Sequence, residues 1–92
     1  MTQGYTEGKD ALLKRLARIE GQVRGISGMV EEDRYCVDIL TQISAAQAAL
    51  DKVSLGLMDG HVRHCVLGTE GTVRDERVEE LIGAVGRLMR TR

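Results

Sequence analysis

Apolar residues in the first third of the chain recur at alternating spacings of four and three. This run comprises Leu12, Leu16, Ile19, Val23, Ile26 and Val30. The spacing keeps these side chains on one face of an α-helix, as in coiled coils and helical bundles. It predicts a first helix over about residues 7–31, with Thr6 as its N-cap.

The same spacing resumes after the acidic segment 31–33. The second run comprises Ile39, Ile43, Ala46, Leu50, Val53 and Leu57. It predicts a second helix over about residues 34–66, for which Asp33 is a suitable N-cap.

A glycine-containing segment, LGTEGT (67–72), predicts a linker after the second helix. Thr72 and Asp75 then form a capping-box pattern, which predicts a third helix over about residues 73–90. No segment has the pattern of a strand or of a second domain. We therefore expect an all-α fold of three helices in a single domain, residues 1–92.

Composition indicates that one copy of the chain has a small core. The chain has 92 residues, no Phe and no Trp, and its only aromatic residues are Tyr5 and Tyr35. The core must therefore be aliphatic, and a chain of this length buries little apolar surface alone. We expect it to complete its core by oligomerising.

The chain has no sequence feature of a secreted or membrane protein. Its first ten residues are polar, and no window approaches the roughly 18 apolar residues of a membrane span. Two cysteines are a poor basis for a disulfide scaffold. We therefore expect a cytoplasmic protein with reduced thiols and no membrane partner.

Both histidines and one cysteine lie within HVRHC, residues 61–65. On a helix, His61 and Cys65 are separated by about one turn, so their side chains can converge on one ion. His64 diverges from Cys65, although geometry alone leaves it as an alternative ligand. A partly buried histidine beside a small apolar cysteine, with no metal, is the simpler interpretation.

The second thiol strengthens the metal interpretation. Cys36 falls in the first turn of the second predicted helix, where unpaired N–H groups and the helix dipole favour the thiolate that binds metals. It shares one helical face with His61; this face, called the seam below, comprises positions 36, 40, 43, 47, 50, 54, 57 and 61. The helix between Cys36 and His61 spans roughly 37 Å. A second copy packed antiparallel along the seam would therefore be needed to bring Cys36 to His61 and Cys65, and a two-fold axis would create two such sites.

Two thiolates and one imidazole form a soft donor set. Such ligands favour Cu(I), whereas Zn(II) usually takes a fourth ligand but is compatible with these ligand types.

These residues, with the segments RLARIEGQVRGISGMVEEDRYCVDILTQISAAQAAL and VEELIGAV, resemble the copper-sensitive operon repressor (CsoR) family of the CsoR/RcnR group. The resemblance covers nearly the whole of residues 12–88. It implies an antiparallel four-helix-bundle dimer, commonly assembled into a tetramer, that binds operator DNA without metal and releases it when metal binds. The implied Cu(I) ligands are Cys36 from one subunit and His61 and Cys65 from the other.

The resemblance also implies residues around the ligands. Tyr35 and Glu80 match the family's outer-shell tyrosine and glutamate, which orient the ligating histidine; Glu79 is the alternative to Glu80. Residues 1–10 contain no histidine of the kind that the group's nickel and cobalt sensors use.

DNA binding would require a local basic patch, because the net charge is −1 and no helix-turn-helix signature is present. Lys14, Arg15 and Arg18 lie on an arc of about 100° away from the apolar stripe of the first helix. The simpler interpretation is a solvated basic face. The resemblance implies DNA contacts by Arg15 and Lys52.

Other functions fit the sequence less well. We expect no enzyme, because no glycine-built oxyanion loop or orienting third group accompanies the Cys–His pair. The alternatives are a cytosolic Cu(I) carrier without DNA binding, a related sensor of another metal or of a thiol-reactive inducer, and a helical bundle with inert cysteines.

Overall fold

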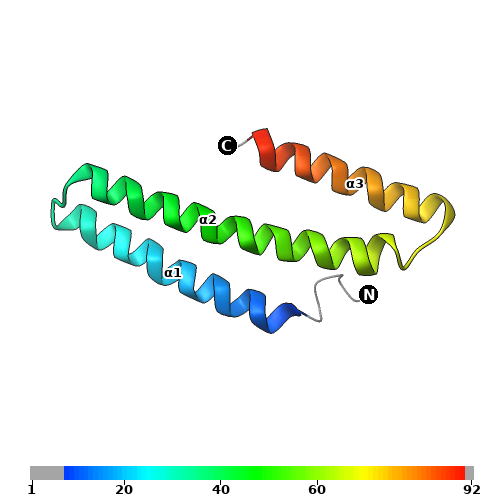
Figure 1. Ribbon diagram of the computed structural model, residues 1–92, viewed down its shortest axis with the longest axis horizontal. Helices are drawn as coiled ribbons and strands as arrows, with labels where there is room; N and C mark the ends of the chain where they lie inside the picture. The colour runs from blue at the N-terminus through cyan, green and yellow to red at the C-terminus, as the bar shows by residue number, and fades with distance from the viewer. Residues whose placement is uncertain (1–7, 91–92) are drawn as a thin grey trace. The chain divides into compact units, whose positions relative to one another are not determined.

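The computed structural model describes residues 8–90, apart from the side chain of Arg90. Its elements are α1 (Lys9–Glu31), α2 (Cys36–Gly60), the short π-helix η2 (His61–Val66) and α3 (Gly71–Arg90) (Figure 1). No strand occurs within the described residues, and the all-α prediction is confirmed. The predicted N-cap Thr6 lies outside the described residues.

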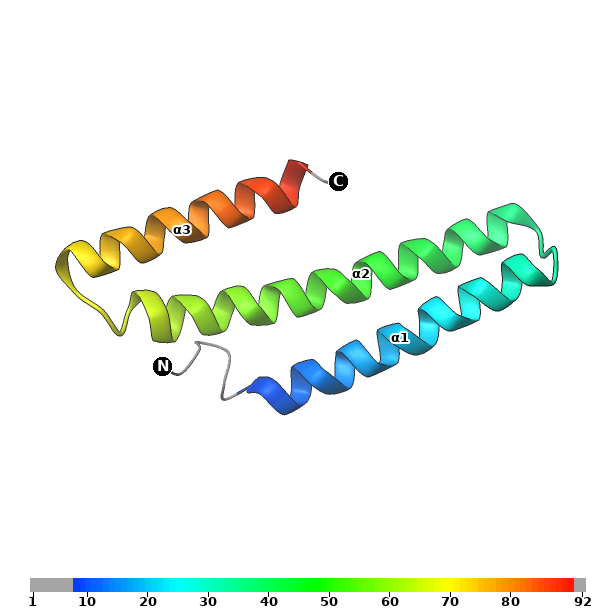
Figure 2. The same ribbon diagram turned by 180° about the vertical axis from the view of Figure 1, so that it is seen from behind.

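The described chain divides into two compact units, residues 8–56 and residues 57–90. In the first unit, α1 and residues 36–56 of α2 form an antiparallel hairpin (Figures 1 and 2). Its buried apolar side chains are Ile19, Ala46 and Val53. These three residues belong to the two predicted stripes, so the periodicity identified the face on which the helices pack.

The turn between α1 and α2 differs from the prediction at Asp33. This residue has φ of 55°, and its N–H donates to the carbonyl of Val30 at 3.1 Å. It therefore terminates α1 in the left-handed conformation, which aspartate tolerates better than most residues. The prediction that Asp33 caps the second helix is wrong: α2 begins at Cys36, and the Tyr35 carbonyl accepts the N–H of Asp38 at 3.1 Å.

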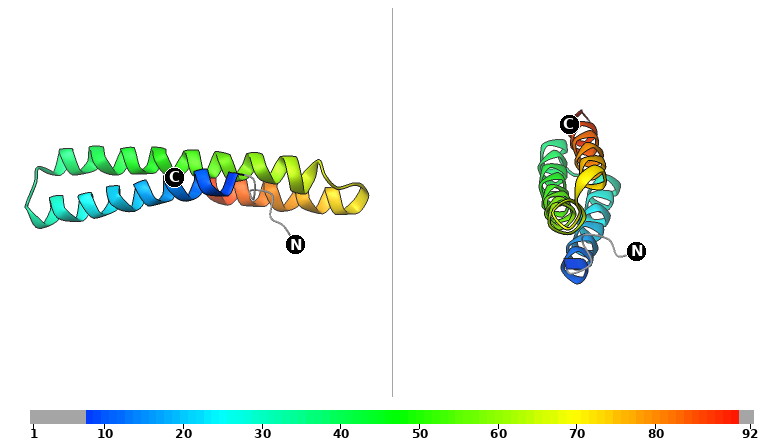
Figure 3. Two further views of the ribbon diagram at one scale, coloured as in Figure 1. Left: turned by 90° about the horizontal axis from the view of Figure 1, so that it is seen from below. Right: turned by 90° about the vertical axis from the view of Figure 1, so that its right-hand side faces the viewer.

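The second unit contains the end of α2, η2, a short connection and α3 (Figure 3). α3 packs against η2. It begins at Gly71, whose φ of 61° lies in the region that glycine adopts without strain. The predicted capping box is wrong, because Thr72 is already inside the helix and the carbonyl of Glu70 accepts the N–H of Arg74 at 3.4 Å.

One face of α2 has little cover within a single chain. The residues Ala46 and Val53 of the predicted stripe are buried, whereas the alternate residues Ile43, Leu50 and Leu57 are 37%, 45% and 39% exposed. The stripe therefore serves two surfaces, one inside the hairpin and one facing outward. No helix within residues 8–90 is long and apolar enough to cross a bilayer.

Candidate metal centre

Two of the predicted ligands lie on a π-helical turn. The helix that starts at Cys36 is regular to Gly60 and then widens into η2, where the N–H of Leu67 donates to the carbonyl of Val62 at 2.8 Å, five residues earlier. His61 is the first residue of η2 and Cys65 the fifth. Single π turns are rare and occur frequently at functional sites.

The His61 ring is half-buried and faces α3. Its Nε2 lies 3.5 Å from the backbone carbonyl oxygen of Arg77, at the outer limit of a hydrogen bond. Because a carbonyl can only accept, this contact requires the proton on Nε2 and leaves the lone pair of a neutral ring on Nδ1. His61 can therefore offer Nδ1 to a metal ion while α3 fixes its orientation.

The segment after Cys65 is held by a cluster of polar contacts. The hydroxyl of Thr69 lies 3.0 Å from the carbonyl oxygen of Cys65 and 2.9 Å from that of Val66. Arg74 Nε donates to the carbonyls of Thr69 at 2.7 Å and Val66 at 3.2 Å, and its Nη2 donates to that of Leu67 at 3.3 Å. We call Thr69 and Arg74 the clamp, because together they satisfy carbonyls that the end of a helix leaves without partners.

Sequence reasoning missed the clamp, although one signal was present. Arg74 lies in the first turn of α3, where the positive end of the helix dipole disfavours a cation. A cation at that position indicates a specific acceptor elsewhere, and the acceptors are the carbonyls at the end of η2. Thr69 gives a weaker signal, because a hydroxyl four residues after Cys65 can reach its carbonyl.

The connection between η2 and α3 also needs a glycine. A Cβ on Gly68 would lie 2.8 Å from the backbone oxygen of His64, closer than such atoms approach. His64 itself is exposed, whereas His61 is half-buried. The two histidines that sequence geometry left as alternatives therefore differ in burial.

The third predicted ligand lies at the other end of α2. Cys36 is the first residue of this helix, and its thiol is free and exposed; Cys65 is free and half-buried. Within residues 8–90, no three His, Cys, Asp or Glu side chains come together as a group that could hold a metal. The described part of one chain thus brings His61 and Cys65 onto the same turn without a third donor beside them.

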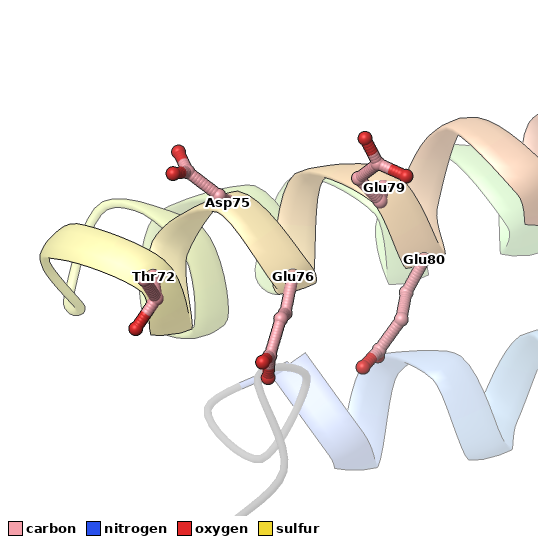
Figure 4. A pocket seen from close by; sticks show the side chains of 5 residues that line it. All are labelled: Thr72, Asp75, Glu76, Glu79 and Glu80. Carbon is pink, nitrogen blue, oxygen red and sulfur yellow. The ribbon is translucent and has the colours of Figure 1, made fainter.

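The predicted outer-shell residues have other surroundings in the single chain. Tyr35 is 68% exposed, directly before α2. Glu80 Oε1 accepts from Arg77 Nη1 at 2.7 Å. Glu80 also belongs to an acidic surface hollow of α3, in which Glu76 and Glu80 project to one side of the helix and Asp75 and Glu79 to the other (Figure 4). The orienting roles of Tyr35 and Glu80 stay predictions.

The candidate DNA-binding residues all lie in the first unit. Lys14, Arg15 and Arg18 are on α1 and Lys52 is on α2, and all four side chains are exposed. Their positions are compatible with contacts to phosphate groups. Their role in binding DNA stays a prediction.

Comparison with known proteins identifies the family. Residues 8–87 match the family described as metal-sensitive transcriptional repressor. The copper-sensing transcriptional repressor RicR of Mycobacterium tuberculosis (strain ATCC 25618 / H37Rv) is 50% identical over 91 residues, which cover 96% of this chain and 95% of the relative.

Two solved structures have the same fold. The copper-sensing repressor CsoR with Cu(I) from Geobacillus thermodenitrificans NG80-2 is 44% identical, with a TM-score of 0.84 over 90% of this chain and 88% of that one. The nickel-responsive transcriptional regulator InrS is 38% identical, with a TM-score of 0.72 over 85% of this chain and 89% of that one. The resemblance that the sequence predicted is therefore confirmed, and the chain belongs to the family of metal-sensitive transcriptional repressors.

Proposed function

We propose that this protein is a Cu(I)-responsive transcriptional repressor. Its metal-free form binds operator DNA, and Cu(I) binding releases the DNA, so that genes for copper efflux or resistance are expressed. The observation that carries the proposal is the pairing of His61 and Cys65 on one half-buried turn, with Nε2 of His61 directed to α3. The copper-sensing relatives support the choice of metal.

Cys36 of one chain, with His61 and Cys65 of a partner, forms the proposed ligand set. Each residue fits this role: Cys36 is an accessible thiol at a helix start, and the other two residues share a turn. Two thiolates and one imidazole are soft donors that suit Cu(I). Coordination through them would join the beginning of α2 in one chain to η2 in the other.

The same ligand set requires an antiparallel homodimer, and the seam is the surface we propose for it. Its apolar residues Leu40, Ile43, Leu50 and Leu57 are 37% to 60% exposed in one chain. Apolar side chains exposed along one helix face favour an interface, and Gln47 and Ser54 of the same seam would lie within it. We expect a dimer or tetramer by light scattering, and a monomer at micromolar concentration would contradict the ligand set.

The basic residues Lys14, Arg15, Arg18 and Lys52 are the proposed contacts to operator phosphates. They recur in every subunit of a homo-oligomer, so their contributions add and fall steeply with salt. We place the protein in the cytoplasm and assign it no enzymatic activity.

A mobility-shift titration tests the proposal. Metal-free protein should retard an operator fragment, and Cu(I) under reducing conditions should release it, with Zn(II) and Ni(II) as control metals. Release by Ni(II) but not Cu(I) would favour a nickel sensor similar to InrS. Failure of the metal-free protein to bind operator fragments at low salt would favour a Cu(I) carrier.

Metal and DNA binding must also be reciprocal. If Cu(I) weakens DNA binding by a given factor, saturating operator must weaken Cu(I) binding by the same factor. Equal Cu(I) affinities with and without operator would contradict the repressor mechanism, even in a protein that binds both ligands.

A further inference from the structure

Arg77 contacts two residues that are expected to serve the metal centre. Its backbone carbonyl lies 3.5 Å from Nε2 of His61, and its guanidinium Nη1 lies 2.7 Å from Oε1 of Glu80. The Arg77 side chain is 30% exposed and that of Glu80 is 59% exposed. One residue of α3 therefore meets the proposed ligand through its backbone and the expected outer-shell carboxylate through its side chain.

These two contacts place Arg77 where Glu80 was expected to act. An outer-shell carboxylate would accept a hydrogen bond from Nε2 of His61. In this structure Nε2 faces the Arg77 carbonyl, and the Glu80 carboxylate accepts from the Arg77 guanidinium. A carboxylate is a stronger acceptor than a carbonyl. Transfer of Glu80 from Arg77 to His61 would therefore make the imidazole a better donor to the metal.

We propose that Arg77 is a positioning residue that retains Glu80 while the site is empty and thereby lowers the affinity for Cu(I). The inference rests on the proposed function, since it assumes that His61 is a ligand. Binding of the metal would exchange the Arg77–Glu80 ion pair for a His61–Glu80 hydrogen bond. The exchange therefore loses the free energy of the Arg77–Glu80 ion pair.

The expected effect is small and measurable. Exposed ion pairs contribute at most about 1 kcal/mol, which corresponds to about a fivefold change in an equilibrium constant. Removing the guanidinium should therefore tighten Cu(I) binding by up to about fivefold. The gain must require Glu80, because a carboxylate that is absent cannot be retained.

The experiment is a double-mutant cycle on Cu(I) affinity, measured without DNA by competition with a chromophoric chelator. It compares the wild type with Arg77→Met, Glu80→Gln and the double variant, all at equal chain concentration. Methionine keeps the aliphatic stem and the helix propensity of arginine. Arg87→Met removes the same charge from an exposed position of the same helix and is the matched control.

The expected result is tighter binding by Arg77→Met, no such gain when Glu80→Gln is already present, and wild-type affinity for Arg87→Met. Arg77→Lys keeps the charge and should return the affinity to within about twofold of the wild type. Unchanged or weaker binding by a folded Arg77→Met, or an equal gain with Glu80→Gln present, would overturn the inference. A wild-type protein that binds no Cu(I) would instead overturn the proposed function.

Should Arg77→Met lose its helical circular dichroism, Arg77→Gln, which also removes the charge, takes its place in the cycle, and Arg77→Lys separates charge from packing. Lysine cannot reproduce the planar guanidinium fork. If the charge of residue 77 retains Glu80, Arg77→Lys should bind Cu(I) with wild-type affinity. If the guanidinium acts through packing, Arg77→Lys should bind Cu(I) more weakly, which would contradict the inference.

Discussion

Replacing Arg74 with alanine should loosen the end of η2. The substitution removes the guanidinium that donates to three carbonyls, those of Val66, Leu67 and Thr69, over 2.7 to 3.3 Å. The Thr69 hydroxyl would remain as the only side-chain part of the clamp. The perturbation therefore affects the two residues that follow Cys65 without altering a proposed ligand.

The magnitude follows from the geometry. Hydrogen bonds from a charged donor contribute about 1.5 to 3 kcal/mol when shielded from water. The clamp is only half-buried, so the freed carbonyls regain water, and we expect a net loss of about 1 to 2 kcal/mol. The dipole contributions nearly cancel, because Arg74 is unfavourable at the start of α3 and favourable at the end of η2. A loss of this size lowers Tm by about 4 to 16 °C in a chain of this length.

Thermal unfolding followed by circular dichroism is the assay, at one chain concentration for all variants. Arg63→Ala is the control, since it breaks the exposed Arg63–Asp59 pair on the same turn (3.0 Å) and should change stability by no more than about 0.5 kcal/mol. Arg74→Lys should recover only part of the loss, because lysine lacks the fork. If the Arg74→Ala and Arg63→Ala variants had the same Tm, the guanidinium contacts of Arg74 would contribute no net stability, and the clamp would not stabilise the end of η2.

Three further predictions concern the turn, the ligands and the DNA contacts. Gly68→Ala places a Cβ against the His64 carbonyl and should lower the free energy of unfolding by about 1 to 3 kcal/mol in chemical denaturation. Gly86→Ala enters open space on α3 and should not destabilise the protein; equal stability of the two variants would contradict the clash. His61→Ala should abolish tight Cu(I) binding in a chelator competition and His64→Ala should leave it within a few fold, and the reverse order would exchange their roles. Arg15→Ala should weaken operator binding and reduce the slope of log K against log salt by about 1 for each phosphate that Arg15 neutralises, and an unchanged slope would remove Arg15 from the interface.

The helices were predictable because the apolar residues that a helix buries recur at helical spacing in the sequence. Ile19, Ala46 and Val53 are buried at positions that the four-three spacing selects. The caps were less predictable, because one residue type can serve opposite ends. Asp33 was suitable as an N-cap, yet it ends α1 with a positive φ, since both roles use a short polar side chain.

The part of the site that could be predicted from the sequence is the part that residue type identifies. Residue type and spacing single out Cys36, Cys65 and the two histidines as candidate donors, and the family resemblance selects His61 over His64. Their role as ligands stays a prediction. The π turn, the clamp and the Arg77–Glu80 pair depend on how the chain reverses after residue 66, and no periodic pattern describes that reversal. Arg74 gave a signal only as a cation at an unfavourable end of a helix.

The placement of Cys36 at the start of α2 and of His61 on η2 has a genetic consequence for the proposed sites. If each site takes Cys36 from one chain and His61 from the other, a subunit lacking one donor disables one site of a mixed dimer and leaves the second intact. A subunit lacking both Cys36 and His61 disables both sites, although its wild-type partner is unaltered. In a cell that makes both kinds of chain, single-donor alleles would therefore be partly complemented by the wild-type copy, whereas the double-donor allele would be dominant.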